Sequence, residues 1–76
     1  MMNLAGEIPA SKSVAAAHWF HLAADQGLPE AQRILGILYA EGIGVSQNDL
    51  ETIKWYRLAA DQGDAVSQYY LAHIYV

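Results

Sequence analysis

The sequence predicts an all-α fold, a right-handed α-α superhelix (solenoid) of antiparallel helix pairs with about four helices. A ten-residue segment at 18–27 is repeated almost unchanged at 54–63. Over the longer segments 18–40 and 54–76, ten of the 23 positions are identical. Self-similarity at a period of 36 residues is typical of stacked helical repeats. Apolar residues recur at helical spacing, and connections of a few residues favour antiparallel neighbours.

The first two helices form the first predicted hairpin. We expect a helix over about 11–26, where alanine and aromatic residues recur at helical spacing and Gly27 ends the helix. We expect a second helix over about 29–41, because Pro29 suits a first helical turn, where its missing N–H costs nothing.

The glycine-rich stretch 42–45 ends the second helix, and the third copies the first. Asn48 is expected to cap a helix over about 49–62, with Glu51 completing a capping box. A fourth helix is expected to follow a cap at Asp64 and to continue to the end of the chain.

The positions of the aromatic and small residues predict how the helices pack against one another. Trp19 and Trp55 each precede an alanine pair by one turn, which favours a role in the core over ligand stacking. Gly36, and Ala72 at the equivalent position, are expected to let a neighbouring helix approach closely.

Composition narrows the function classes. The 76 residues suffice for one small domain, and there is no cysteine to form a disulfide, a thiolate metal site or a thiol nucleophile. Four basic and eight acidic residues argue against nucleic acid, and no apolar run is long enough for a membrane span. Residues 1–13 lack the features of a signal peptide, so a cytoplasmic location is the default expectation.

Three stretches carry the landmarks of a known repeat. They are Ala-x-x-x-Leu-Gly-x-x-Tyr at 31–39, Gly-x-Gly-Val at 42–45 and Trp-Tyr-x-x-Ala-Ala-x-x-Gly at 55–63. With these landmarks in this order the chain resembles the Sel1-like repeats, relatives of the tetratricopeptide repeats. Members are mostly adaptors and scaffolds, and in bacteria often take part in signalling or host interaction. The resemblance implies a protein-binding module and no catalysis.

The resemblance also predicts a domain organisation. We expect a poorly ordered N-terminus at 1–10 and a repeat region at 11–76. Within that region one complete repeat at 30–63 is flanked by two half repeats, so the chain looks like a slice of a longer array or a truncated reading frame.

The resemblance places the first helix of each repeat, here the helices over 29–41 and after Asp64, on the concave surface. The residues it would expose there for a protein or peptide partner are Glu30, Arg33, Ile37, Ala40, Val66, Tyr69, His73 and Val76. Arg33 and Tyr69 stand out, because arginine and tyrosine are enriched at binding hot spots. The alternative is that these residues serve ordinary surface or inter-repeat packing.

No catalytic, cofactor or metal site is predicted. His18, His21 and Asp25 could share a helical face and bind zinc, but a zinc site wants a further ligand that the sequence does not supply. Their equivalents one repeat later, Lys54 and Arg57 among them, favour a solvated charged face. Gly42 and Gly44 lack the third glycine and the strand of a phosphate loop.

The two ends of the predicted stack are uncapped. The fourth helix is rich in large apolar residues, and repeat arrays need polar capping units for solubility. We therefore expect the chain to self-associate through its terminal helices, the fourth helix of one copy docking where a further hairpin would lie. A second possibility is a purely structural piece of a longer array that has no site of its own.

Overall fold

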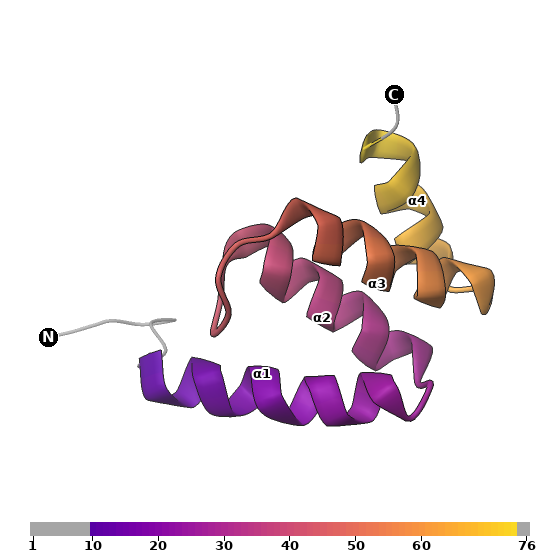
Figure 1. Ribbon diagram of the computed structural model, residues 1–76. Helices are drawn as coiled ribbons and strands as arrows, with labels where there is room; N and C mark the ends of the chain where they lie inside the picture. The colour runs from indigo at the N-terminus through magenta and orange to yellow at the C-terminus, as the bar shows by residue number, and fades with distance from the viewer. Residues whose placement is uncertain (1–9, 75–76) are drawn as a thin grey trace, which may run out of the picture.

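The computed structural model describes residues 10–74, and that part of the chain contains four α-helices and no strand. The helices are α1 (Ala10–Asp25), α2 (Pro29–Glu41), α3 (Asp49–Asp61) and α4 (Ala65–Ile74). Each packs chiefly on the next along the chain, with α2 between α1 and α3 (Figure 1). The predicted all-α superhelix of antiparallel helix pairs is confirmed.

The expected helix boundaries agree with the structure to within about two residues where both are described. Pro29 occupies the first turn of α2, and Gly27 and Gly63 have φ values of 92° and 93° just after α1 and α3. Positive φ strains residues with a side chain, so glycine is the residue that ends these helices without cost. Of the expected disordered segment 1–10, residues 1–9 lie outside the described range, as do Tyr75 and Val76 of the expected fourth helix.

The capping box predicted at the start of α3 is only half correct. The Asn48 side chain accepts a hydrogen bond from the Glu51 N–H at 3.1 Å, as expected of a cap. The Asn48 N–H, however, donates to the Tyr39 carbonyl at 3.0 Å, and Glu51 Oε1 accepts from Trp55 Nε1 at 3.1 Å. Because a tertiary contact satisfies the Asn48 N–H, the glutamate is free to hold the tryptophan.

The hydrophobic core is small and lies where α1, α2 and α3 meet. Its buried members are Ala24, Ala31, Leu35 and Trp55, with partly buried apolar residues of α1 and α2 around them. Alanine on α1 and α2 leaves room for the indole between the helices, so one large ring fills the space that three helices enclose.

Trp19 does not belong to this core, and the sequence-based prediction for it was wrong. Its side chain is 68% exposed, whereas Trp55, its equivalent one repeat later, is 3% exposed. Trp55 is buried because α1 and α2 both pack against it. Within the described residues no helix pair covers the corresponding side of α1, so Trp19 remains on the surface.

Gly36 has the close-approach role predicted for it. A Cβ atom at this position would lie 2.7 Å from two ring carbons of Tyr56. Because that distance is shorter than real Cβ contacts, α2 and α3 can approach this closely only with glycine on α2. The Tyr56 ring is in this way fixed beside α2 and faces α4.

Candidate functional site

A groove lies between the second half of α2, the first half of α3 and α4. Its volume is about 360 Å³. The lining residues are Ile37, Ala40 and Glu41 from α2, Asp49, Thr52 and Tyr56 from α3, and Tyr70, His73 and Ile74 from α4. Three consecutive helices therefore line one groove.

Two tyrosines form the aromatic part of the groove. The Tyr56 and Tyr70 ring centroids are 5.3 Å apart, with 31° between the ring planes. Burial raises the pKa of the Tyr56 hydroxyl, and Tyr70 and Glu41 raise it further. The phenol therefore stays neutral at physiological pH and offers a hydrogen-bond donor beside an apolar surface.

The groove has two acidic residues, one at the end of α2 and one at the start of α3. Glu41 is the last residue of α2 and Asp49 the first of α3, and both are exposed. His73, also exposed, lies on the α4 side, and its ring meets the Tyr69 ring edge-on at a centroid distance of 4.6 Å. An apolar group with a neighbouring positive charge fits this combination of aromatic and acidic residues.

Of the eight residues predicted for the concave surface, Val76 lies outside the described residues and the other seven divide into three groups. Ile37, Ala40 and His73 line the groove, and Tyr69 contacts His73 at its edge. Glu30 and Val66 are exposed near the starts of α2 and α4 and do not line the groove. Arg33 is held by a contact within the chain. Tyr56 and Tyr70 were not predicted as groove residues, because the aromatic pattern indicates burial but does not indicate which edge of a ring stays accessible.

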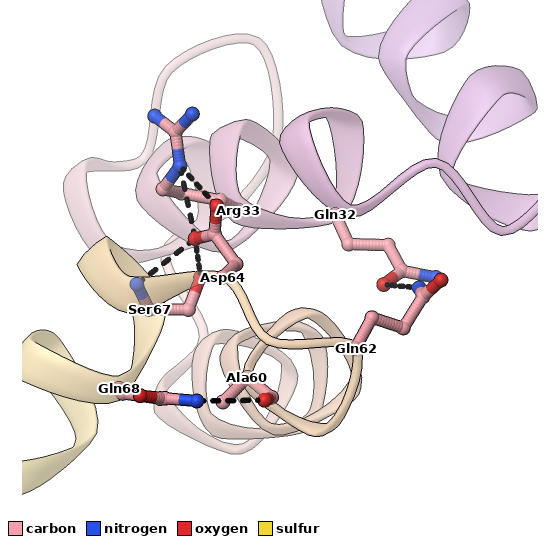
Figure 2. A network of polar contacts seen from close by, with 7 residues as sticks. All are labelled: Gln32, Arg33, Ala60, Gln62, Asp64, Ser67 and Gln68. Atoms are coloured by element: carbon pink, nitrogen blue, oxygen red, sulfur yellow. Dashed lines mark hydrogen bonds and ion pairs between the residues drawn. The ribbon is translucent and has the colours of Figure 1, made fainter.

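Arg33 and Asp64 tie the start of α4 to α2. The Arg33 Nε–H donates to both carboxylate oxygens of Asp64, at 3.1 and 3.4 Å. The same carboxylate accepts from the Ser67 N–H at 2.9 Å and from the Ser67 hydroxyl at 2.6 Å. Figure 2 shows the two terminal nitrogens of Arg33 pointing away from Asp64. Asp64 therefore caps α4, as predicted, and also joins the two helices.

This network predicts a loss of stability in acid. The Ser67 hydroxyl, the Ser67 N–H and Arg33 lower the pKa of Asp64 below 3.8, its ordinary value, against the opposing effect of burial. A carboxylate with a lowered folded-state pKa stabilises fully above its unfolded pKa, and that stability is lost as the pH falls through the folded-state pKa. Urea midpoints measured between about pH 6 and pH 2 should therefore fall more for the wild type than for Asp64→Asn. Parallel curves would contradict the assignment.

Glutamines form a second set of contacts, two within the hairpins and one between them (Figure 2). Gln32 is buried; its side-chain amide donates to the Ala24 carbonyl at 3.2 Å, and its Oε1 accepts from Gln62 Nε2 at 2.8 Å. One repeat later, Gln68 donates to the Ala60 carbonyl at 3.1 Å. The buried amide joins three helices, because Ala24 lies on α1, Gln32 on α2 and Gln62 just after α3.

The histidines of α1 contact aromatic rings. His18 lies edge-on to Trp19, and His21 lies edge-on to Trp55 at a centroid distance of 5.5 Å while its Nδ1 is 3.6 Å from Asp25. Within residues 10–74 no group of three or more His, Cys, Asp or Glu side chains is placed to hold a metal ion. None of the helices described is long and apolar enough to cross a membrane.

Comparison with known proteins identifies the repeat. The model of the Sel1 repeat matches residues 1–28 and 29–64. A Sel1 repeat protein from Oxalobacter formigenes has a similar structure, with 39% identity, a TM-score of 0.79, and coverage of 80% of this chain and 25% of its own. A protective antigen of uropathogenic Escherichia coli strains, displaying an SLR fold, shares 47% identity with a TM-score of 0.71, over 72% of this chain and 12% of its own. No match was found among curated proteins.

Proposed function

The chain belongs to the Sel1 repeat family, and we propose that it is a non-catalytic module that binds a peptide or protein through its concave face. Sel1 repeats are generally protein-interaction modules, and the family consists generally of non-enzymatic scaffolds. The chain spans only 25% and 12% of the length of the two similar structures, so the partners of those longer proteins do not indicate the partner of this chain. The proposal rests on the groove itself.

The groove chemistry supports a particular kind of partner segment. Tyr56 and Tyr70 offer an apolar, neutral surface, and Glu41 and Asp49 bring negative charge beside it. An extended or helical segment with an aliphatic side chain next to a lysine or arginine satisfies both parts. Burial of the aliphatic group drives binding, and the acidic residues favour the basic neighbour by electrostatic attraction.

We propose distinct roles for six of the predicted residues. Ile37 and His73 contact the segment in the groove, and Tyr69 extends the contact area along α4. Glu30 and Val66 make peripheral contacts at the starts of their helices. Arg33 uses Nε within the chain, and its terminal nitrogens, which point away from Asp64 in Figure 2, would donate hydrogen bonds to a partner carboxylate.

A groove-filling substitution tests the binding site. Random peptides displayed on phage are selected against the immobilised chain, and the selected peptides are then measured by titration calorimetry. Ala40→Phe, which fills the groove, should weaken binding at least about tenfold, because it occupies the space beside Tyr56. Leu50→Ala, on the outer face of α3, should leave binding unchanged. Selected peptides that bind Ala40→Phe as tightly as the wild type would exclude the groove.

A second candidate is a structural role in a longer array. It is favoured by the exposure of Trp19, which is the equivalent of a core residue. In this alternative one complete repeat at 30–63, flanked by half repeats, adds length to a solenoid without a site of its own. We also propose that the isolated chain self-associates through α1 and α4, where Trp19 and Tyr69 are exposed.

A further inference from the structure

The two helical hairpins of the chain are built by the same contacts. After α1, the N–H groups of Gln26 and Gly27 donate to the carbonyls of Ala23 and Ala24, and Leu28 donates to Ala23. After α3, the residues 36 positions later repeat all three hydrogen bonds. The surface that α3 and α4 present at one end of the chain therefore has the backbone geometry of the surface that α1 and α2 present to α3.

The interface between α2 and α3 shows what covers such a surface. On α3 its buried positions are Thr52, Trp55, Tyr56 and Ala59. One repeat earlier, on α1, the equivalents are Ala16, Trp19, Phe20 and Ala23, and none of them is buried. On α2 the buried positions are Ala31, Gln32, Leu35 and Gly36. Of their equivalents on α4, Ser67, Gln68, Leu71 and Ala72, only Ser67 is buried. The α3 side of the interface thus recurs on α1, and the α2 side recurs on α4, in both cases with most of its residues not buried within the described residues.

The polar part of the interface is already arranged at the α4 end. Gln68 donates to Ala60 as Gln32 donates to Ala24, so its Oε1 has the position from which Gln32 accepts the Gln62 amide. The equivalent of Gln62 is Gln26, which is exposed at the end of α1. In Figure 2 the Gln32–Gln62 pair is complete, whereas Gln68 is drawn with its Ala60 contact alone. A second copy would bring Gln26 to the Gln68 oxygen.

One pair of positions differs in chemistry between the inner interface, which α2 forms with α3 within the chain, and the outer interface, which α4 of one copy would form with α1 of another. Arg33 and Asp64, the inner ion pair, correspond to Tyr69 and Leu28 one repeat onward and one repeat back. Tyr69 is 61% exposed and Leu28 is 52% exposed. Between two copies these residues would form an apolar contact in place of the ion pair, so both members of the outer pair change in the same direction.

We propose that copies of the chain associate head to tail, α1 of one copy packing on α4 of the next in the register of the α2–α3 interface. The inference rests on the proposed self-association and names its partner, a second copy, and its geometry. Trp19 of the second copy packs beside Ala60 and Leu71 of the first copy, as Trp55 packs beside Ala24 and Leu35 within the chain. The interface joins two different surfaces, so each added copy exposes a new acceptor face, and assembly continues as a helical filament or closes as a ring.

Mixing two one-sided variants tests the head-to-tail arrangement. Trp19→Glu removes the α1 face, and Gln68→Glu combined with Tyr69→Glu removes the α4 face; all three side chains are exposed. Each variant alone should be monomeric by light scattering, and an equimolar mixture should form a one-to-one heterodimer through the remaining intact faces. Val14→Glu is the matched control. Its equivalent one repeat later, Leu50, is 80% exposed although α2 and α3 are packed together, so Val14 should also lie outside the contact between copies.

A charge exchange tests the register itself. Leu28→Asp alone should weaken association at least about tenfold, because it places an unpaired carboxylate against Tyr69. The double variant L28D/Y69R recreates the inner ion pair between copies and should recover association at low salt. Circular dichroism checks that every variant retains its helices.

The outcomes separate the register from the proposed function. A wild type that stays monomeric at all concentrations overturns the self-association and this inference together, and leaves peptide binding in the groove to its own test. A wild type that associates while Trp19→Glu associates equally overturns the register alone. The same holds if the mixture of one-sided variants stays monomeric, or if one of the two variants still dimerises alone, as a symmetric contact of α1 with α1 or of α4 with α4 would allow.

Discussion

Replacing Trp55 with alanine is expected to destabilise the chain by about 3–5 kcal/mol, whereas the same change at Trp19 should leave the stability of the monomer nearly unchanged. Trp55 contacts the buried residues Ala24, Ala31 and Leu35, and its indole N–H donates to Glu51. Truncation removes the contacts and leaves a cavity between three helices. A domain of this size has a total stability of only about 4–11 kcal/mol, so Trp55→Ala should lose a large part of its stability.

The two tryptophan variants form a matched pair, because they occupy the same place in successive repeats. Urea unfolding followed by circular dichroism, at concentrations low enough to keep the chain monomeric, measures both. Similar losses of stability for Trp19→Ala and Trp55→Ala would mean that Trp19 is covered within the chain, contrary to its exposure in the structure.

Gly44→Ala is expected to cost about 3 kcal/mol or more, from two separate causes. Gly44 has a φ of 74°, a conformation that strains any residue with a Cβ atom. A Cβ atom there would also overlap the backbone carbonyl of Ser13 on α1, so the loop after α2 would have to move away from α1. Steric overlap of this kind typically adds about 1–3 kcal/mol.

Gly63→Ala separates the two causes. Gly63 has a φ of 93°, but nothing lies within 4 Å of a Cβ atom built on it, so alanine there should cost only the backbone strain, about 1–2 kcal/mol. Comparing the free energies of unfolding of the two variants isolates the contribution of the loop contact. Equal losses would show that the loop does not depend on its contact with α1.

The sequence predicted those features that depend on local chemistry. Pro29, Asn48 and Asp64 mark the starts of helices, and Gly27 and Gly63 mark their ends, because capping and positive φ act over a few residues. The period of 36 residues then predicted the stacking of the hairpins.

Features that depend on the neighbours of a residue were less accessible from the sequence. Trp19 and Trp55 have almost the same local sequence, yet only Trp55 has helices on both sides. Glu51 has the spacing of a capping box, but its carboxylate reaches the Trp55 indole. The contact of Arg33 with Asp64 spans 31 positions, and no local pattern announces it. The groove residues Tyr56 and Tyr70 belong to the same class.

We propose that one helical interface is formed once within the chain and that its two halves recur, one on α1 and one on α4, where further copies can bind. The most direct test is the molar mass of the wild-type chain, measured by light scattering across a concentration series. We predict a weight-average mass that rises steadily above 8.3 kDa with concentration and does not stop at a dimer. A mass that stays at 8.3 kDa over the whole series would contradict the account.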